Sequence, residues 1–257
     1  MARYQLTLIY DGTDFFGSQR QAKRRTVQGE LEEALCQLGW TGRSVLMSGR
    51  TDTGVHATGQ GAACDLDWSH SDGELVRALN AVLPADIAVH NARMVPPTFH
   101  PRFDALSRRY RYRLFCHPLR DPIRERVVWR LWPTVSGDML SEIARLFLGT
   151  HDFSAFGSPT TPGGGTVRTV MKAEWSQAEK DEWHFEVQAD AFLYRMVRRL
   201  VFVQVAVAQG KVSAETVARS LAGKALAGND RLPGGLAPAH GLTLIEVAYP
   251  DIESMGQ

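Results

Sequence analysis

Cysteine is scarce in this chain of 257 residues, which has only Cys36, Cys64 and Cys116. The number is odd, the spacings are long and no C-x-x-C pair occurs, so the sequence offers neither a disulfide framework nor a zinc knuckle. Long apolar runs are absent too, because the best candidate, Leu200–Ala208, is far shorter than the ~20 residues of a membrane span. The first ten residues alternate like a strand and do not read as a signal peptide. We therefore predict a cytoplasmic protein with no membrane partner.

An excess of one charge is also lacking. Lys and Arg total 29 against 28 Asp and Glu, which excludes a globally basic chain and an acidic disordered one. Lysine is nevertheless rare, with 5 residues against 24 arginines. The planar, permanently charged guanidinium suits phosphate and base recognition. Because an Arg-rich genome would give the same ratio, the positions of the arginines carry more information than their number.

Hydrophobic periodicity predicts an alternation of strands and helices. The predicted strands are 3–10, 44–48, 61–68, 87–95, 105–117, 167–175, 182–189 and 242–249. The predicted helices are 27–38, 72–83, 135–148, 192–208 and 213–222. Two successive strand–helix–strand–strand–helix–strand sets fit this order. Hairpins mixed with helices favour an α+β fold with a mixed, mainly antiparallel sheet over a doubly wound parallel one.

The most informative stretch follows a short predicted strand and runs Gly49-Arg50-Thr51-Asp52-Thr53-Gly54-Val55-His56-Ala57. Gly49 and Gly54 have the spacing of a phosphate-binding loop, but Val55 and His56 stand where that motif needs Lys and Ser or Thr. Asp52 and His56 are four residues apart, yet Gly54 disfavours the helix that would bring them to one face. From spacing alone, Asp52 is either a structural turn residue or a functional carboxylate.

A second stretch, Ser107–Arg113, alternates arginines with tyrosines on a predicted strand. One face would carry Arg109, Arg111 and Arg113, and the other would carry Tyr110 and Tyr112. Nucleic-acid surfaces use arginines for phosphates and rings for bases. An ordinary sheet with buried tyrosines and a solvated basic face explains the pattern equally well, and both can hold along one strand.

Two further basic clusters stand near predicted helices. On the helix 192–208, Arg195, Arg198 and Arg199 have the i, i+3, i+4 spacing of one face. Lys23-Arg24-Arg25 precedes the helix that follows Thr26. Either cluster would attract a phosphate or an internal carboxylate, and a solvated helix face is the plain alternative.

These residues together resemble the TruA-type tRNA pseudouridine synthases nearly end to end. The resemblance rests on six ordered stretches, which are Tyr10–Gln19, Gly49–Ala57, Ser107–Tyr112, His151–Phe153 with Phe156, Phe192–Arg198, and Ala237–Leu242. The second stretch matches the family's active-site motif at every position. Ser18 departs from the pattern, because the family commonly carries Trp there.

The resemblance implies a role for several residues. Asp52 would be the catalytic aspartate, Tyr110 would stack on the target uracil, Arg198 would pair with Asp52, and Arg50 would help displace the base or hold its place in the stack. The remaining arginines expected to bind substrate are Arg24, Arg25, Arg109, Arg111 and Arg195.

The resemblance also implies the substrate and the architecture. The expected reaction converts uridine to pseudouridine at positions 38–40 in the anticodon arm of tRNA, by a homodimer without metal or other cofactor. We expect two similar α/β halves flanking a central basic active-site cleft. The N-terminal half, residues 1–104, would carry the Asp52 loop. The C-terminal half, residues 105–257, would carry the tyrosine strand and the arginine helix.

The chemistry of the residues agrees with this expectation. Exchange of a C–N for a C–C glycosidic bond on one base is redox-neutral, so the lack of any cofactor motif is consistent with it. One carboxylate suffices as nucleophile or base, and a base taken out of its stack needs an aromatic pocket wall. A nearby Arg198 would keep Asp52 ionised.

Two other classes of function compete with this one. A non-catalytic RNA-binding module would use the same arginines but would gain nothing from a carboxylate facing phosphates. A metal-dependent nuclease would need two or three clustered carboxylates, and the motif around Asp52 has one.

Overall fold

The computed structural model describes residues 1–223 and 231–251, and these contain ten strands and five α-helices. The chain forms two compact units. Unit 1 comprises Met1–Ser107 with the described residues from Thr243 onward, and unit 2 comprises Arg108–Leu242. Most strand pairs are antiparallel, so the predicted α+β class is confirmed. Within the described residues, no helix combines the length and apolar character needed to span a bilayer.

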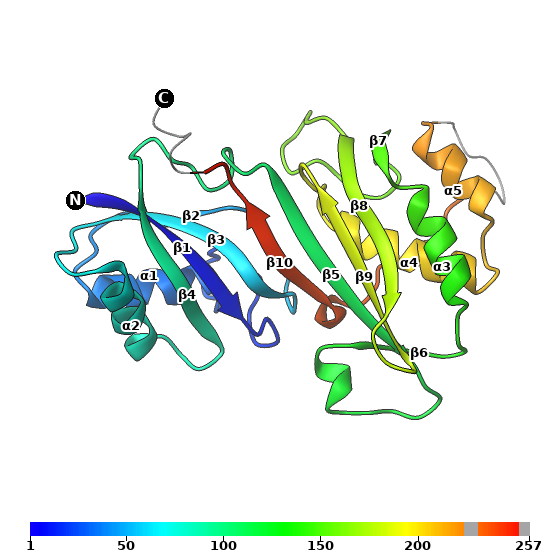
Figure 1. Cartoon of the computed structure of the whole chain (residues 1–257), viewed down its shortest axis with the longest axis horizontal. Helices are drawn as coiled ribbons and strands as arrows, with labels where there is room; N and C mark the ends of the chain where they lie inside the picture. The colour runs from blue at the N-terminus through cyan, green and yellow to red at the C-terminus, as the bar shows by residue number, and fades with distance from the viewer. Residues whose placement is uncertain (224–230, 252–257) are drawn as a thin grey trace. The chain divides into compact units, whose positions relative to one another are not determined.

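Unit 1 has the strand order β4-β1-β3-β10, with β2 paired on β3 (Figure 1). Its strands are Ala2–Tyr10 (β1), Leu46–Met47 (β2), His56–Leu66 (β3), Ile87–Val95 (β4) and Leu242–Ala248 (β10). The central strand β1 is antiparallel to both β3 and β4, whereas β10 runs parallel to β3. The unit therefore has a mixed sheet, in which the C-terminal strand pairs with the strand that follows the Asp52 loop.

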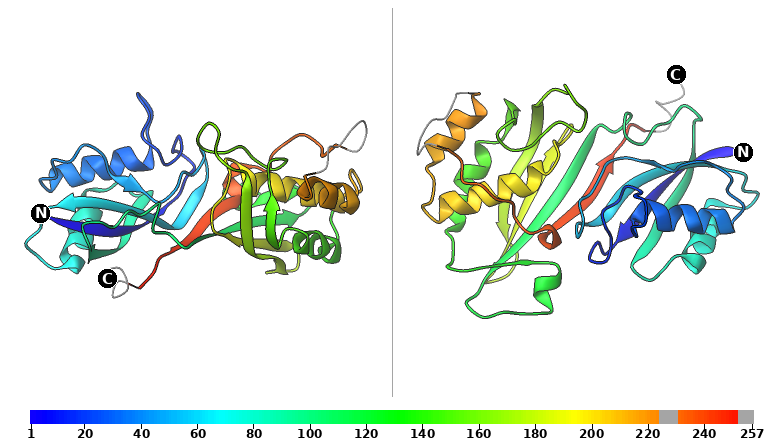
Figure 2. Two further views of the ribbon diagram at one scale, coloured as in Figure 1. Left: turned by 90° about the horizontal axis from the view of Figure 1, so that it is seen from above. Right: turned by 180° about the vertical axis from the view of Figure 1, so that it is seen from behind.

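Two helices cover one face of this sheet, as the rear view in Figure 2 shows. They are Val27–Gln37 (α1) and Asp72–Val82 (α2). Thr26 caps α1 by accepting a hydrogen bond from the Gly29 N–H at 3.2 Å, which satisfies a donor that the helix leaves unpaired. Ser71 and Glu74 form a reciprocal capping box on α2. Leu31 of α1 and Leu79 of α2 are fully buried, so apolar burial holds both helices on the sheet.

Unit 2 has the strand order β5-β9-β8-β7, with the short β6 parallel to β5. Its strands are Ser107–Cys116 (β5), Trp129–Leu131 (β6), Gly149–Asp152 (β7), Val167–Gln177 (β8) and Glu182–Ala189 (β9). Its α-helices are Gly137–Arg145 (α3), Met196–Ala208 (α4) and Ala214–Leu221 (α5). The buried Trp175 of β8 donates its indole N–H to Gln204 of α4 at 2.8 Å. This bond fixes α4 against the sheet.

The division of the chain differs in detail from the predicted boundary after residue 104. The first predicted set of elements, β1-α1-β2-β3-α2-β4, lies wholly in unit 1. The second set runs from β5 to β10, but β10 belongs with unit 1 because Thr243 and Leu244 pair with His56 and Ala57 of β3. The chain therefore returns to its first unit at its C-terminal end.

The sequence patterns did not predict two short strands, and they misplaced the start of a third. β6 and β7 have three and four residues, too few for an alternating pattern. β3 begins at His56 rather than at the predicted residue 61. Its first half contains Gly59, where a Cβ atom would lie 2.1 Å from the Ile245 carbonyl oxygen on β10. The close approach of β10 therefore selects glycine over the β-branched residues that predict a strand.

Candidate active site

Asp52 lies in the loop that joins β2 to β3 in unit 1. The loop ends in a tight turn, because the Val55 N–H donates to the Asp52 carbonyl at 3.1 Å. Gly54 occupies the third position of this turn with φ +79°, a conformation that glycine adopts without the steric cost of a Cβ atom. Asp52 is half-buried, whereas Arg50, two residues earlier, is exposed. The loop thus presents one partly shielded carboxylate beside one solvated guanidinium.

Tyr110 lies on β5 of unit 2, two residues before Tyr112 on the same strand face. Tyr112 and Leu114 on the same predicted face are fully buried. These two side chains therefore belong to the core, as the alternative of an ordinary sheet predicted. Tyr110 is only half-buried. Its ring meets the ring of Phe192 edge to face, with the centroids 5.1 Å apart and the planes at 89°. Phe192 therefore limits the orientations that the Tyr110 ring can take.

The arginine face of β5 is paired with carboxylates of its own unit. Arg111 donates from Nε and Nη2 to Glu186 Oε1 at 3.0 and 2.6 Å, and Arg109 Nη1 lies 3.6 Å from Glu186 Oε2. Lys172 donates to the same carboxylate at 2.8 Å. Burial alone would raise the pKa of Glu186, but the bonds from Lys172 and Arg111 outweigh it and lower the pKa to about 2. Glu186 thus neutralises part of the positive charge that the sequence pattern assigned to RNA binding.

The arginine helix begins later than predicted. α4 starts at Met196, because Arg195 has φ +63° and occupies the N-cap position outside the helix. The prediction that Phe192–Arg195 is helical is therefore wrong, and Arg195 does not share a helical face with Arg198 and Arg199. Arg195 is exposed, with its guanidinium 4.7 Å from the centre of the Tyr194 ring.

Arg198 and Arg199 are tied to the segment that precedes β10. Arg198 Nε donates to the Ala237 carbonyl at 2.8 Å, and the Ala237 N–H donates to the Arg198 carbonyl at 3.1 Å. Arg199 donates to the carbonyls of Pro233 and Gly235. Burial lowers the pKa of the Arg199 guanidinium. The stretch Ala237–Leu242 therefore orients Arg198 from outside its helix.

The same stretch packs against Tyr112, the buried tyrosine of β5. Tyr112 donates its hydroxyl to the Pro238 carbonyl at 2.9 Å. At Gly241, a Cβ atom would lie 2.7 Å from the Tyr112 ring. Residues 237–241 therefore connect the core residue Tyr112 with Arg198 within unit 2, and the close contact with the Tyr112 ring explains the glycine at position 241.

The basic loop before α1 contains two arginines with different surroundings. Arg25 is held by Asp86 through two hydrogen bonds of 2.6 and 2.8 Å and by Glu30 through a third of 2.7 Å. Arg24 is exposed, and its guanidinium lies 4.5 Å from the centre of the Phe16 ring. Arg25 thus has a structural task within unit 1, and Arg24 is the member of the pair presented to solvent.

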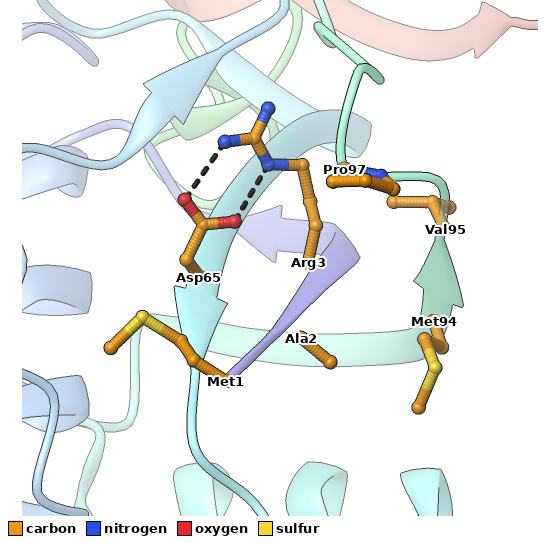
Figure 3. Close-up of a pocket in the computed structure, with 7 residues that line it drawn as sticks. All are labelled: Met1, Ala2, Arg3, Asp65, Met94, Val95 and Pro97. Atoms are coloured by element: carbon orange, nitrogen blue, oxygen red, sulfur yellow. Dashed lines mark hydrogen bonds and ion pairs between the residues drawn. The ribbon is translucent and has the colours of Figure 1, made fainter.

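An open hollow of about 440 Å³ at the start of β1 does not offer a second site for binding phosphate (Figure 3). Arg3 and Asp65 face each other there in a two-pronged ion pair with bonds of 2.7 and 2.8 Å. The third guanidinium nitrogen of Arg3 donates to the Phe99 carbonyl at 3.0 Å. With its charge balanced and its donors engaged, Arg3 has little left to offer a phosphate. In the described parts of the chain, no three His, Cys, Asp or Glu residues group as metal ligands.

Comparison with known proteins places the chain in a family. A family model described as tRNA pseudouridine synthase matches residues 7–104 and 143–250. The tRNA pseudouridine synthase A of Chloroflexus aurantiacus is 41% identical over 257 residues, covering 97% of this chain and 90% of the relative. That of Solidesulfovibrio magneticus is 44% identical over 255 residues, covering 97% and 92%. The chain therefore belongs to the tRNA pseudouridine synthase family and is an isomerase of that class.

Proposed function

We propose that this enzyme isomerises uridine to pseudouridine at positions 38–40, in the anticodon stem-loop of tRNAs. The observation that carries the proposal is Asp52. It is the one carboxylate of the Gly49–Ala57 stretch, and a tight turn presents it half-buried beside an exposed arginine. The family membership and the match of this stretch to the family's active-site motif support the same assignment.

Asp52 acts on the target nucleotide as nucleophile or base. The reaction must break the bond from the ribose to the base nitrogen and form a bond from the ribose to a base carbon. A single carboxylate serves either role, because it can attack a carbon atom or accept a proton. The exposed Arg50 is suited to displace the target base or to hold its place in the stack, since a guanidinium is planar and cationic.

Tyr110 receives the flipped uracil, and Arg198 is the third residue that we assign to catalysis. The Tyr110 ring is half-buried and braced by Phe192, as a stacking platform needs to be. Arg198 has its Nε bonded to Ala237, which sets the direction of its side chain.

The remaining arginines bind the tRNA backbone. Arg24 and Arg195 are exposed and suited to phosphates. Arg25, Arg109 and Arg111 bond to carboxylates of their own units, so we assign them first to holding the binding surface in shape. We further propose that the enzyme acts as a homodimer in the cytoplasm and takes no metal or organic cofactor.

Asp52→Asn tests the catalytic assignment. It removes the charge and the nucleophile but keeps the shape, so we expect no detectable pseudouridine while tRNA affinity stays within about tenfold, or ~1.4 kcal/mol. Single-turnover conversion and equilibrium binding measure the two quantities. Asp67→Asn is the matched control, because that side chain is 92% exposed in the same unit, and it should leave both unchanged.

Two results would contradict the proposal. Turnover of Asp52→Asn above about 1% of the wild-type rate, a loss of less than ~2.7 kcal/mol in transition-state stabilisation, would remove the catalytic role. A wild-type protein that binds tRNA without converting it would favour the non-catalytic RNA-binding module.

A further inference from the structure

Ser18 is a fully buried polar residue that contacts the loop of Asp52. Its hydroxyl accepts a hydrogen bond from the Thr51 N–H at 2.8 Å. Its own N–H donates to the Thr51 carbonyl at 3.1 Å. That carbonyl belongs to the peptide that joins Thr51 to Asp52. One serine therefore holds both backbone polar groups of the residue before the carboxylate.

The side chain of Thr51 is held from the opposite direction. Its hydroxyl lies 2.9 Å from the hydroxyl of Tyr10 at the end of β1. Gln60 of β3 donates from Nε2 to the Tyr10 oxygen at 3.4 Å and to the Gly49 carbonyl at 3.2 Å. Ser48 donates to Gln60 Oε1 at 2.5 Å. Loop residues 48, 49 and 51 are thus tied to the two central strands of the unit.

These five residues, which we call the Thr51 network, are almost inaccessible to solvent. Tyr10, Ser18, Ser48, Thr51 and Gln60 are between 0% and 6% exposed. Burying polar groups is costly unless each finds a partner. Burial raises the pKa of Tyr10 to about 12, so its hydroxyl stays protonated at neutral pH. Apolar side chains would fill the same space without supplying the bonds, so the network serves orientation rather than burial.

The segment that carries Ser18 is itself anchored to a rigid element. The Val27 and Gln28 N–H groups at the start of α1 donate to the carbonyls of Gly17 and Ser18 at 3.4 and 2.9 Å. Gly17 has φ +88°, and a Cβ atom there would lie 2.8 Å from the Thr51 carbonyl oxygen. Glycine therefore permits the close approach, and α1 fixes the position from which Ser18 reaches the loop.

We propose that Ser18 and Tyr10 are positioning residues that set the orientation of Asp52 through Thr51. This inference rests on the catalytic role of Asp52 proposed above. A catalytic group must be held within a fraction of an ångström of its productive place, and a misplacement of 1 Å can cost about 10²-fold in rate. Within the loop that carries Asp52, the network bonds residues 48, 49 and 51. Its loss therefore shifts Asp52 without removing any group to which we assign a tRNA contact.

Ser18→Ala and Thr51→Val test the two sides of the network. Each removes one anchor of Thr51, and we expect the single-turnover rate with saturating enzyme to fall about 10–100-fold. The tRNA dissociation constant should stay within about threefold. Thr51→Ser keeps the hydroxyl and should restore most of the rate lost in Thr51→Val.

Tyr10→Phe separates orientation from folding. It should lower the rate at least as much as Thr51→Val does. The double variant should be no slower than Tyr10→Phe alone, since Tyr10→Phe already removes the Tyr10–Thr51 bond. Tyr4→Phe is the matched control, because Tyr4 is buried on the same strand but lies outside the network. It should leave the rate unchanged. Thermal unfolding of every variant verifies that the rates are measured on folded enzyme.

The outcomes separate this inference from the proposed function. If Asp52→Asn is inactive while Ser18→Ala and Thr51→Val convert bound tRNA within twofold of wild type, the positioning role is wrong and the catalytic role stands. If Asp52→Asn remains active, both the catalytic role of Asp52 and the positioning role of the network are wrong. Additive losses in the Tyr10→Phe, Thr51→Val pair would likewise overturn the network as a unit.

Discussion

Tyr110 is half-buried on β5, two residues before the fully buried Tyr112 on the same strand face. Its ring alone would serve for stacking, which is worth ~1–3 kcal/mol per base and needs only a π-face. In the proposed reaction its hydroxyl would have a second capacity, which is to accept the proton from the base carbon after the new bond forms. Phenylalanine keeps the first capacity and lacks the second.

Tyr110→Phe should therefore bind tRNA normally and lose at least about 10²-fold in turnover, which is the lower end of what a positioned proton transfer contributes. The measurement is single-turnover conversion with saturating enzyme, so that binding does not enter the comparison. Tyr194→Phe, an exposed tyrosine of the same unit, is the control. Conversion within a few-fold of wild type would leave Tyr110 as a stacking platform only.

Arg24 and Arg25 are neighbours in sequence with different surroundings, so their alanine variants should differ. Arg24→Ala should flatten the log–log dependence of tRNA affinity on salt by about one unit and change the free energy of unfolding by less than ~0.5 kcal/mol. Arg25→Ala leaves Asp86 and Glu30 without their cation and should lower that free energy by about 1–3 kcal/mol. Salt titration of binding and denaturant unfolding measure the two effects. Equal salt slopes for Arg24→Ala and wild type would place Arg24 outside the tRNA contact.

At the scale of elements, the β5-β9-β8 strands carry a row of ion pairs around Glu186. The side chain of Glu186 is 12% exposed, and its cationic partners lower its pKa from 4.5 to about 2. The folded state therefore favours the ionised form. This contribution to stability is complete above about pH 4.5 and is lost as the pH falls toward 2.

Glu186→Gln should lower the free energy of unfolding at neutral pH, by up to about 3 kcal/mol. It should also make that free energy depend less steeply on pH between about 4.5 and 2. Denaturant unfolding at a series of pH values measures both effects. Glu142→Gln on α3, which changes an exposed carboxylate, is the reference. Parallel pH curves for Glu186→Gln and wild type would contradict the assignment.

Element ends show where local patterns stop being sufficient. The predicted starts of α1 after Thr26 and of α2 at residue 72 are confirmed, because the residues that cap a helix lie within four positions of its start. The start of α4 was missed, because the positive φ of Arg195 accompanies the Tyr194 N–H bond to the Ser158 carbonyl. That partner is 36 residues away in sequence, beyond the reach of any local pattern.

At the scale of the whole molecule, we expect a homodimer. The formal charge of +1 leaves little electrostatic repulsion to oppose association of two copies. Analytical sedimentation at micromolar protein should give twice the mass of the chain, and the same mass should persist in moderate salt. A mass of about 28.5 kDa under these conditions would be that of a single chain and would contradict the dimer.

The sequence by itself determined the α+β class and most helix and strand positions, and through its resemblance to a family it proposed Asp52, Tyr110 and Arg198 as site residues. The hydrophobic periodicity, the helix caps and the residue types of a short motif depend only on residues near one another in the sequence, so a sequence pattern can reveal them. Tertiary structure alone decided that β10 rejoins unit 1, that Arg25 and Arg111 are bound by Asp86 and Glu186, and that Ser18 holds the loop of Asp52. Each of these depends on residues more than 30 positions apart whose contact is fixed only by packing of the chain, so no local pattern encodes it.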